Sequence, residues 1–182
     1  QEAAIHYGYP VRTVQGDMRD LAMFADNDFD LVYQAYSLNF VPQVDPVFRA
    51  VARVLRPGGR YQLQWANPFT QSVDDQAWDG ETYLLHHPYL DGFETSIYYP
   101  TWDIEEEDGR WRQIASPREF RHILSTVING LVAHGFVITR LKEAVSNESK
   151  PKPGTWEHYK SVAPPYLTIW SIWRPDILPL NT

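Results

Sequence analysis

The stretch RVLRPGGRYQLQW, residues 53–65, reads as the end of a helix, a sharp turn and the start of a strand. The segment before it, VDPVFRAVARVL (44–55), places apolar side chains at helical spacing. Asp45 is its expected N-cap, and Pro46 stands at the first helical position. The pair Gly58-Gly59 is expected to end the helix as a left-handed C-cap, with a strand over residues 60–67.

A short, largely apolar run, DFDLVYQAY (28–36), precedes this helix and predicts a strand buried on both faces of a parallel sheet. Strand, helix and strand with short turns form a βαβ unit, whose two strands are parallel. The run VRTVQGD (11–17) predicts a further strand that ends in a turn. Ligands bind beyond the carboxyl ends of such strands. The first candidates for a site are therefore the residues that follow the three strands: Asp17-Met18, Gln34 to Asn39, and Asn67.

The second half of the chain predicts different elements. Residues 68–115 are irregular and aromatic, with a hairpin that turns at Glu107-Asp108-Gly109, and we expect them to cover the pocket as a lid-like insertion. Ser116, Pro117 and Glu119 spell a capping box for a long helix. The final prediction is an antiparallel pair of strands at the sheet edge, residues 136–144 and 166–175, joined by a loop. Residues 1–182 would form one domain.

Composition excludes several classes of protein. The chain has 182 residues, of which 43% are hydrophobic, a net charge of −7 and no cysteine. Disulfides, thiolate nucleophiles and zinc–thiolate sites are therefore excluded. Without a basic stripe, nucleic acid is not expected as a main partner, and no apolar run approaches the ~20 residues that span a membrane. The expected location is the cytoplasm. The first residue is Gln, so we expect the chain to be the remainder of a longer one.

Three short motifs in this order resemble a known family: GDMRDL (16–21), FDLV (29–32) and RVLRPGG (53–59). Together they are similar to the later motifs of class I S-adenosylmethionine-dependent methyltransferases of the small-molecule type. The resemblance implies a Rossmann-like α/β methyltransferase sheet, mostly parallel, with a C-terminal antiparallel strand pair. It also implies S-adenosylmethionine as the cofactor.

The resemblance assigns cofactor contacts residue by residue. Asp17 matches the acid that accepts a hydrogen bond from the adenine amino group, and the backbone N–H of Met18 would face the adenine ring. Gln34 and Ala35, followed by Tyr36, match the strand end that lines the methionine part of the cofactor. For Asp17 the alternative is a plain turn, because Gly-Asp is a common turn sequence.

One part of the family's pattern is absent. No Gly-rich loop precedes residue 11, nor does the acid that would hold the ribose hydroxyls. Two N-terminal βα units, ~60 residues, are therefore expected to be missing, through truncation, an incomplete gene or disorder. The strand that ends at Gln34 would then have an open edge. Either residues 11–15 pair with it directly, or a second chain covers it in a homodimer.

The candidates for contact with a methyl acceptor are polar or aromatic side chains past strand ends or in the insertion: Tyr36, Asn39, Asn67, His86, His87 and Tyr89. The two histidines are otherwise loop residues bonded to backbone, and Asn67-Pro68 is otherwise a turn. Trp156, His158 and Tyr159 either close the pocket or pack a long loop on the sheet. No metal site is expected at these spacings, and no catalytic residue is identified.

The function that follows is methyl transfer from S-adenosylmethionine to a small molecule, with an apolar or aromatic acceptor favoured by the aromatic insertion. The alternative is a non-catalytic binding or scaffold protein that kept the methyltransferase fold. A nucleotide-binding oxidoreductase of the same sheet class is a third interpretation, but RVLRPGG is not its signature.

Overall fold

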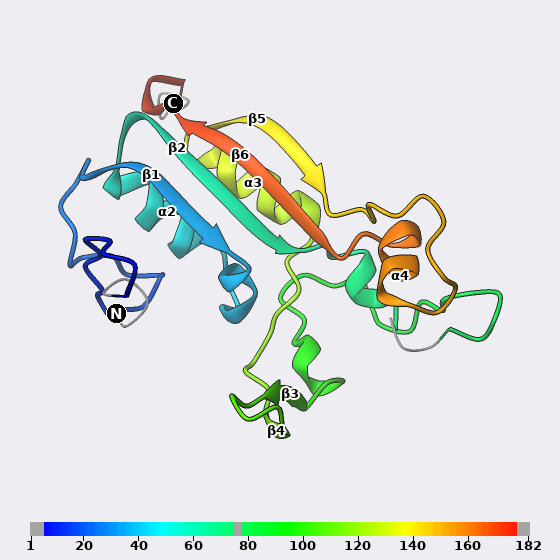
Figure 1. The fold of residues 1–182 in the computed structure, drawn as a ribbon. Coiled ribbons are helices and arrows are strands. Elements are labelled where there is room, and N and C mark those ends of the chain that lie inside the picture. Colours follow the sequence, from blue (N-terminus) through cyan, green and yellow to red (C-terminus); the bar gives the residue numbers. More distant parts are fainter. Residues whose placement is uncertain (1–5, 75–77, 178–182) are drawn as a thin grey trace.

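The computed structural model describes residues 6–74 and 78–177. Its centre is a four-stranded sheet in the order β1-β2-β6-β5, and helices α2 and α3 lie together on one face of that sheet (Figure 1). A separate hairpin of β3 and β4 stands beyond one end of the sheet. The strands and α-helices are β1 (Phe29–Ala35), α2 (Asp45–Val54), β2 (Leu55–Ala66), β3 (Thr101–Glu105), β4 (Trp111–Ala115), α3 (Leu124–Ala133), β5 (Phe136–Glu143), α4 (Trp156–Val162) and β6 (Tyr166–Trp173).

The β1-α2-β2 unit is confirmed, and its two strands are parallel. Its ends differ from the sequence prediction. Asp45 lies inside the first turn of α2 rather than at the cap, and Leu55 after the helix is already extended. The glycine pair therefore does not cap α2. It lies in an irregularity of β2, where the pairing register moves from Phe29–Leu55 to Leu31–Arg60 and Gly58 takes a φ of 83°.

Two predictions about the first half were wrong. Residues 11–17 form no strand. The reason is that they have no sheet neighbour: in the described part of the chain β1 pairs with β2 alone, so its other edge is open. β1 is also not buried on both faces, because Leu31 is 56% and Tyr33 is 61% exposed while Gln34 is buried against the core.

The sheet is mixed rather than mostly parallel. In the described sheet, β2 pairs with β6 and β5 pairs with β6 in antiparallel fashion, and β1 with β2 is the parallel ladder. The predicted C-terminal antiparallel pair at the sheet edge is thereby confirmed. The predicted hairpin about Gly109 is confirmed as well, as β3 and β4.

The helices of the second half were predicted less well. α3 begins at Leu124, eight residues after the expected start, so the predicted capping box was wrong. Residues 116–123 run outside the helix because the Phe120 N–H donates to the carbonyl of Asn39 at 2.7 Å, and Phe120 bridges to Glu94. The loop predicted before β6 contains α4.

One apolar core fixes the helices to the sheet. Fully buried side chains on β2, β6, α2 and α3 meet in it, and burial of each such side chain is worth ~1.5–3 kcal/mol before entropy costs. The largest apolar or aromatic side chains are Trp65, Tyr61, Phe48 and, on β5, Phe136. None of the helices in the described ranges has the length and apolar character that a bilayer crossing needs.

Candidate functional site

A cleft of about 430 Å³ opens at the end of the sheet where β1 and β2 finish and β6 begins. Its first wall is the sheet end, with Tyr36, Ala66 and Tyr166. The other walls come from residues 95–103, Glu119, the 3-10 turn Thr70–Ser72 and α4. The carboxyl ends of parallel strands are the usual ligand-binding edge of an α/β sheet, so the cleft lies where the sequence placed it.

Tyr36 turns the chain as it leaves β1. Its φ of 57° is a left-handed conformation, uncommon for a large residue and typical of positions held by their surroundings. The ring packs edge-to-face against Tyr166 and Phe40, with centroids 5.7 and 5.8 Å away. The hydroxyl donates to Glu119 Oε2 at 3.0 Å.

The pKa values of Tyr36 and Glu119 are both shifted from their usual ranges. Burial, and then the nearby Glu119 carboxylate, raise the pKa of Tyr36 well above its usual range, so the phenol stays protonated as a donor. Burial also raises the pKa of Glu119, and the hydrogen bond from Tyr36 opposes that rise. Glu119 is therefore a carboxyl group on the cleft wall whose proton affinity is increased.

Asn39 holds three walls of the cleft together. The side chain is 0% exposed. Its Oδ1 accepts from the Ala66 N–H at 3.1 Å, and its Nδ2 donates to the carbonyl of Phe120 at 3.4 Å. With both amide atoms engaged by backbone, Asn39 positions the walls rather than presenting a free group to a ligand.

Asn67 also bonds to backbone. Its Nδ2 donates to the carbonyl of Pro164 at 2.9 Å and its N–H to that of Pro165 at 2.8 Å. These bonds tie the end of β2 to the start of β6, as a turn residue would.

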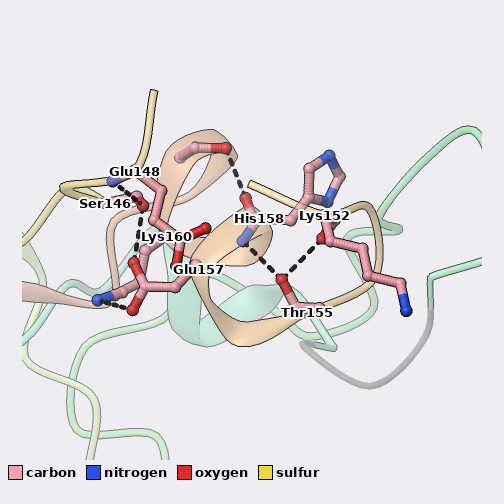
Figure 2. Close-up of polar contacts among 8 residues, drawn as sticks. Ser146, Glu148, Lys152, Thr155, Glu157, His158 and Lys160 are labelled. Carbon is pink, nitrogen blue, oxygen red and sulfur yellow. Dashed lines mark hydrogen bonds and ion pairs between the residues drawn. The ribbon is translucent and has the colours of Figure 1, made fainter. Parts of the chain in front are cut away.

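Helix α4 supplies the far wall, and its first turn is capped by Thr155 (Figure 2). Thr155 Oγ1 accepts from the His158 N–H at 3.3 Å and donates to the carbonyl of Lys152 at 2.7 Å. Glu157, which follows the cleft residue Trp156, accepts from Ser146 at 2.7 Å and pairs with Lys160 at 2.6 Å. The helix is short, so these contacts fix its direction.

Two aromatic residues of α4, Trp156 and Tyr159, line the cleft. The hydroxyl of Tyr159 donates to the carbonyl of Thr70 at 3.1 Å, which joins α4 to the turn after β2. Of the three far-loop candidates, these two reach the cleft. The third, His158, lies outside its lining and interacts with Tyr83 through Nδ1 at 3.1 Å.

The insertion residues His86, His87 and Tyr89 are not among the described lining of the cleft. The His86 N–H donates to the carbonyl of Ser72 at 2.8 Å, and the Tyr89 hydroxyl accepts from the Leu124 N–H at 3.5 Å. The ring of His87 stacks on Tyr98 at 3.7 Å, and burial, with the charge of Arg121, lowers its pKa. His86 and His87 therefore make contacts within the insertion, and Tyr89 contacts the start of α3.

Two of the predicted cofactor residues, Asp17 and Met18, line a second, more open hollow near the cleft. It is lined by residues 15–19 with Phe40 and Val41. Gln34 Nε2 donates to the sulfur of Met18 at 3.4 Å, so the ends of the two segments lie side by side. Gln34 Oε1 accepts from the buried Tyr61 hydroxyl, whereas Ala35 is exposed on the open side of β1.

Asp17 is held as a carboxylate in this hollow. Arg19 donates to both of its oxygens and lowers the pKa of Asp17 to about 2. A charged acceptor beside a thioether and the ring of Phe40 fits the amino group and plane of an adenine. Phe40 also packs near Trp102 of the cleft, at 6.4 Å, so the hollow and the cleft share a wall.

Residues that sequence reasoning missed complete the site. Glu119 was read as a helix-capping residue and Tyr166 as an ordinary strand residue, and both contact Tyr36. For Tyr166 the sequence did offer a signal. It begins a strand predicted to be antiparallel, so it lies at the same end of the sheet as the carboxyl ends of the two parallel strands. The described residues contain no cluster of three or more His, Cys, Asp or Glu that could hold a metal ion.

Comparison with known proteins agrees with this geometry. Residues 1–63 match the family model described as a methyltransferase domain. The uncharacterized methyltransferase YbaJ of Bacillus subtilis is 28% identical over 138 residues, 75% of this chain and 51% of YbaJ. A fatty-acid O-methyltransferase of Mycolicibacterium smegmatis is 46% identical over 55 residues, 30% of this chain and 20% of that protein.

A solved S-adenosylmethionine-dependent methyltransferase from Mesorhizobium loti has the same fold, with a TM-score of 0.62 at 18% identity over 94% of this chain and 74% of that one. The N-terminal third of the chain is thus similar to a methyltransferase domain, and the fold is that of solved S-adenosylmethionine-dependent methyltransferases. The chain spans about half the length of its Bacillus subtilis relative.

Proposed function

We propose that this chain binds S-adenosylmethionine beside Asp17, Met18 and Gln34 and transfers its methyl group to a small molecule held in the cleft. The observation that carries the proposal is the shared wall. Phe40 lines the cofactor hollow and packs on Tyr36, which lines the cleft, so donor and acceptor would meet at the ends of β1 and β2. The cofactor supplies an electrophilic methyl group on a sulfonium, and the protein supplies alignment.

In this proposal the chain's residues have distinct tasks. Asp17 accepts from the adenine amino group, and Gln34, fixed by Tyr61, keeps Met18 in place. Ala35, at the end of β1, would contact the methionine part of the cofactor, and Tyr36 would contact the acceptor. Residues 68–115 act as the lid, because their hairpin supplies Thr101, Trp102 and Asp103 to the cleft.

The remaining parts of the proposal concern partners. We expect a cytoplasmic protein that acts on a small molecule and has no nucleic acid partner. A homodimer would cover the open edge of β1, where Leu31 and Tyr33 are exposed. Sedimentation velocity tests this part: a monomer at micromolar concentration would contradict it.

Equilibrium binding of S-adenosylhomocysteine tests the main claim. At 100 times its Kd the ligand should raise the free energy of unfolding by about 2.7 kcal/mol. Asp17→Asn should weaken binding about tenfold, since it removes a charged acceptor, whereas Asp20→Asn, a nearby exposed carboxylate, should not. Absence of binding by the intact protein would favour the alternative, a non-catalytic member of the fold.

A further inference from the structure

The charge of the cleft wall has one sign. Glu119 and Asp103 are the ionisable acids among the described lining residues, and no Lys, Arg or His is among them. Among the described lining residues, a ligand in the cleft therefore meets two carboxyl groups and no opposing cation.

Nearby cations are already engaged elsewhere. Arg118, next to Glu119 in sequence, pairs with Glu94 at 2.7 Å, and Lys160 of α4 pairs with Glu157 at 2.6 Å. Arg121 contacts a cleft residue from behind, because its guanidinium donates to the carbonyl of Gln71 at 2.7 Å. None of these side chains is in the described cleft lining.

Aromatic rings form a large part of the remaining wall. The rings of the lining belong to Tyr36, Tyr99, Trp102, Trp156, Tyr159 and Tyr166. Trp102 and Trp156 come from different elements, β3 and α4, and are 38% and 45% exposed, so both have ring surface open to a ligand. Ring faces attract cations, and Trp does so most strongly.

We propose that the acceptor is an organic ammonium compound, an amine attached to a planar or apolar body, which the two carboxyl groups and the tryptophans hold in the cleft. This rests on the proposed function and names its substrate class. It separates this chain from the relative named as a fatty-acid O-methyltransferase, because a fatty acid carries a carboxylate and would meet like charges.

Glu119 then has a chemical task as well. An ammonium has no lone pair, so it must lose a proton before it can be methylated. The carboxylate of Glu119 takes that proton. The nitrogen lone pair forms the new C–N bond as the donor's C–S bond breaks, and the electron pair of that bond stays on sulfur. The products are the N-methyl ammonium, the neutral thioether and protonated Glu119, so charge and atoms balance.

Binding of three matched probes tests the substrate class without any methyl transfer. Phenethylamine, 2-phenylethanol and 3-phenylpropionate share an aromatic body and differ in charge at neutral pH. Ligand-observed NMR titration of the intact protein should give the order cation, neutral, anion in affinity. Glu119→Gln and Asp103→Asn should each weaken phenethylamine about three- to fivefold, and should leave 2-phenylethanol within about twofold.

Glu107→Gln is the matched control. It removes one negative charge from the tip of the β3–β4 hairpin, which also carries Asp103, but Glu107 is outside the cleft lining. It should leave all three affinities unchanged, and circular dichroism should confirm that each variant is folded. Equal or tighter binding of the anion overturns the proposal. So does failure of the cation to bind, or weakening by Glu107→Gln as large as by Glu119→Gln. Binding of S-adenosylhomocysteine is a separate measurement, so either claim can fail alone.

Discussion

The hydroxyl of Tyr36 donates to the carboxylate of Glu119 across 3.0 Å, although 83 residues separate them in the chain. Tyr36 ends the first strand of the sheet, and Glu119 lies in the extended segment before α3. The bond therefore closes the cleft between the sheet and the second half of the chain. It also combines a left-handed backbone at Tyr36 with two perturbed acidities, a combination found more often at functional sites than elsewhere.

Replacing Glu119 by Gln should change how stability depends on pH. Burial raises the folded-state pKa of Glu119 above its unfolded value, so its stabilising contribution is complete below the unfolded pKa and is lost as pH rises through the folded pKa. In Glu119→Gln the side chain does not titrate, so the variant does not lose stability in this way as the pH rises. Urea unfolding should show the variant gaining stability relative to the wild type as pH increases above about 4.5.

Tyr36→Phe should strengthen the same effect, because the hydrogen bond from Tyr36 is what opposes the rise in the pKa of Glu119. Carboxyl ¹³C NMR should show a higher pKa for Glu119 in this variant. The lost bond should also cost about 1 kcal/mol of unfolding free energy. Tyr33→Phe, on the exposed face of β1, is the control. An unchanged Glu119 titration in Tyr36→Phe would show that the pair does not interact.

Asn39→Ala should destabilise the protein by about 2 kcal/mol, since it leaves the buried N–H of Ala66 and the carbonyl of Phe120 without the side-chain partner. Urea denaturation measures the loss. Asn147→Ala, in an exposed loop, should change the free energy of unfolding by less than about 0.5 kcal/mol. Similar values for the two variants would refute the positioning role of Asn39.

The first half of the fold was predictable because its signals are local. Apolar spacing over residues 44–55 and the following RPGG turn define α2 and β2 without reference to other parts of the chain. The boundaries failed where tertiary contacts decide. Gly58 serves an irregular register between β1 and β2 rather than a helix cap, and a register is a property of two strands.

The site was predictable to the extent that it lies at strand ends. Tyr36 and the Met18–Gln34 contact follow from the rule that α/β sheets bind ligands at that edge. Glu119 was missed because its local sequence, SPRE, is a good capping box, and the competing bond of Phe120 to Asn39 is invisible along the chain. His122, three residues after Glu119, is 1% exposed, and nothing in its local sequence indicates that burial.

The buried His122 should make stability fall at mildly acidic pH. Burial lowers its folded-state pKa, so the contribution of the neutral ring is complete above its unfolded pKa and is lost as pH falls through and below about 6.5. Its Nε2 lies 3.1 and 2.9 Å from the carbonyls of Leu38 and Val41.

His122→Gln keeps an amide donor and removes the titration. The free energy of unfolding of the wild type should therefore drop more steeply from pH 7 to pH 5 than that of His122→Gln, by up to about 1.4 kcal/mol per pH unit. His6→Gln, at an exposed position, should follow the wild-type curve. Parallel curves for wild type and His122→Gln would mean that the ring does not titrate differently on unfolding.

The cap of α4 should control the far wall of the cleft. Thr155→Ala removes the side-chain acceptor of the His158 N–H and should cost about 1 kcal/mol, while Thr155→Ser keeps the oxygen and should cost little. Because α4 has seven residues, the loss should appear mainly as local opening, which hydrogen exchange reports as faster exchange of the His158 and Tyr159 amides in Thr155→Ala. Equal exchange in the alanine and serine variants would mean that the hydrogen bond from Tyr159 to the carbonyl of Thr70, and not the cap, holds the helix in place.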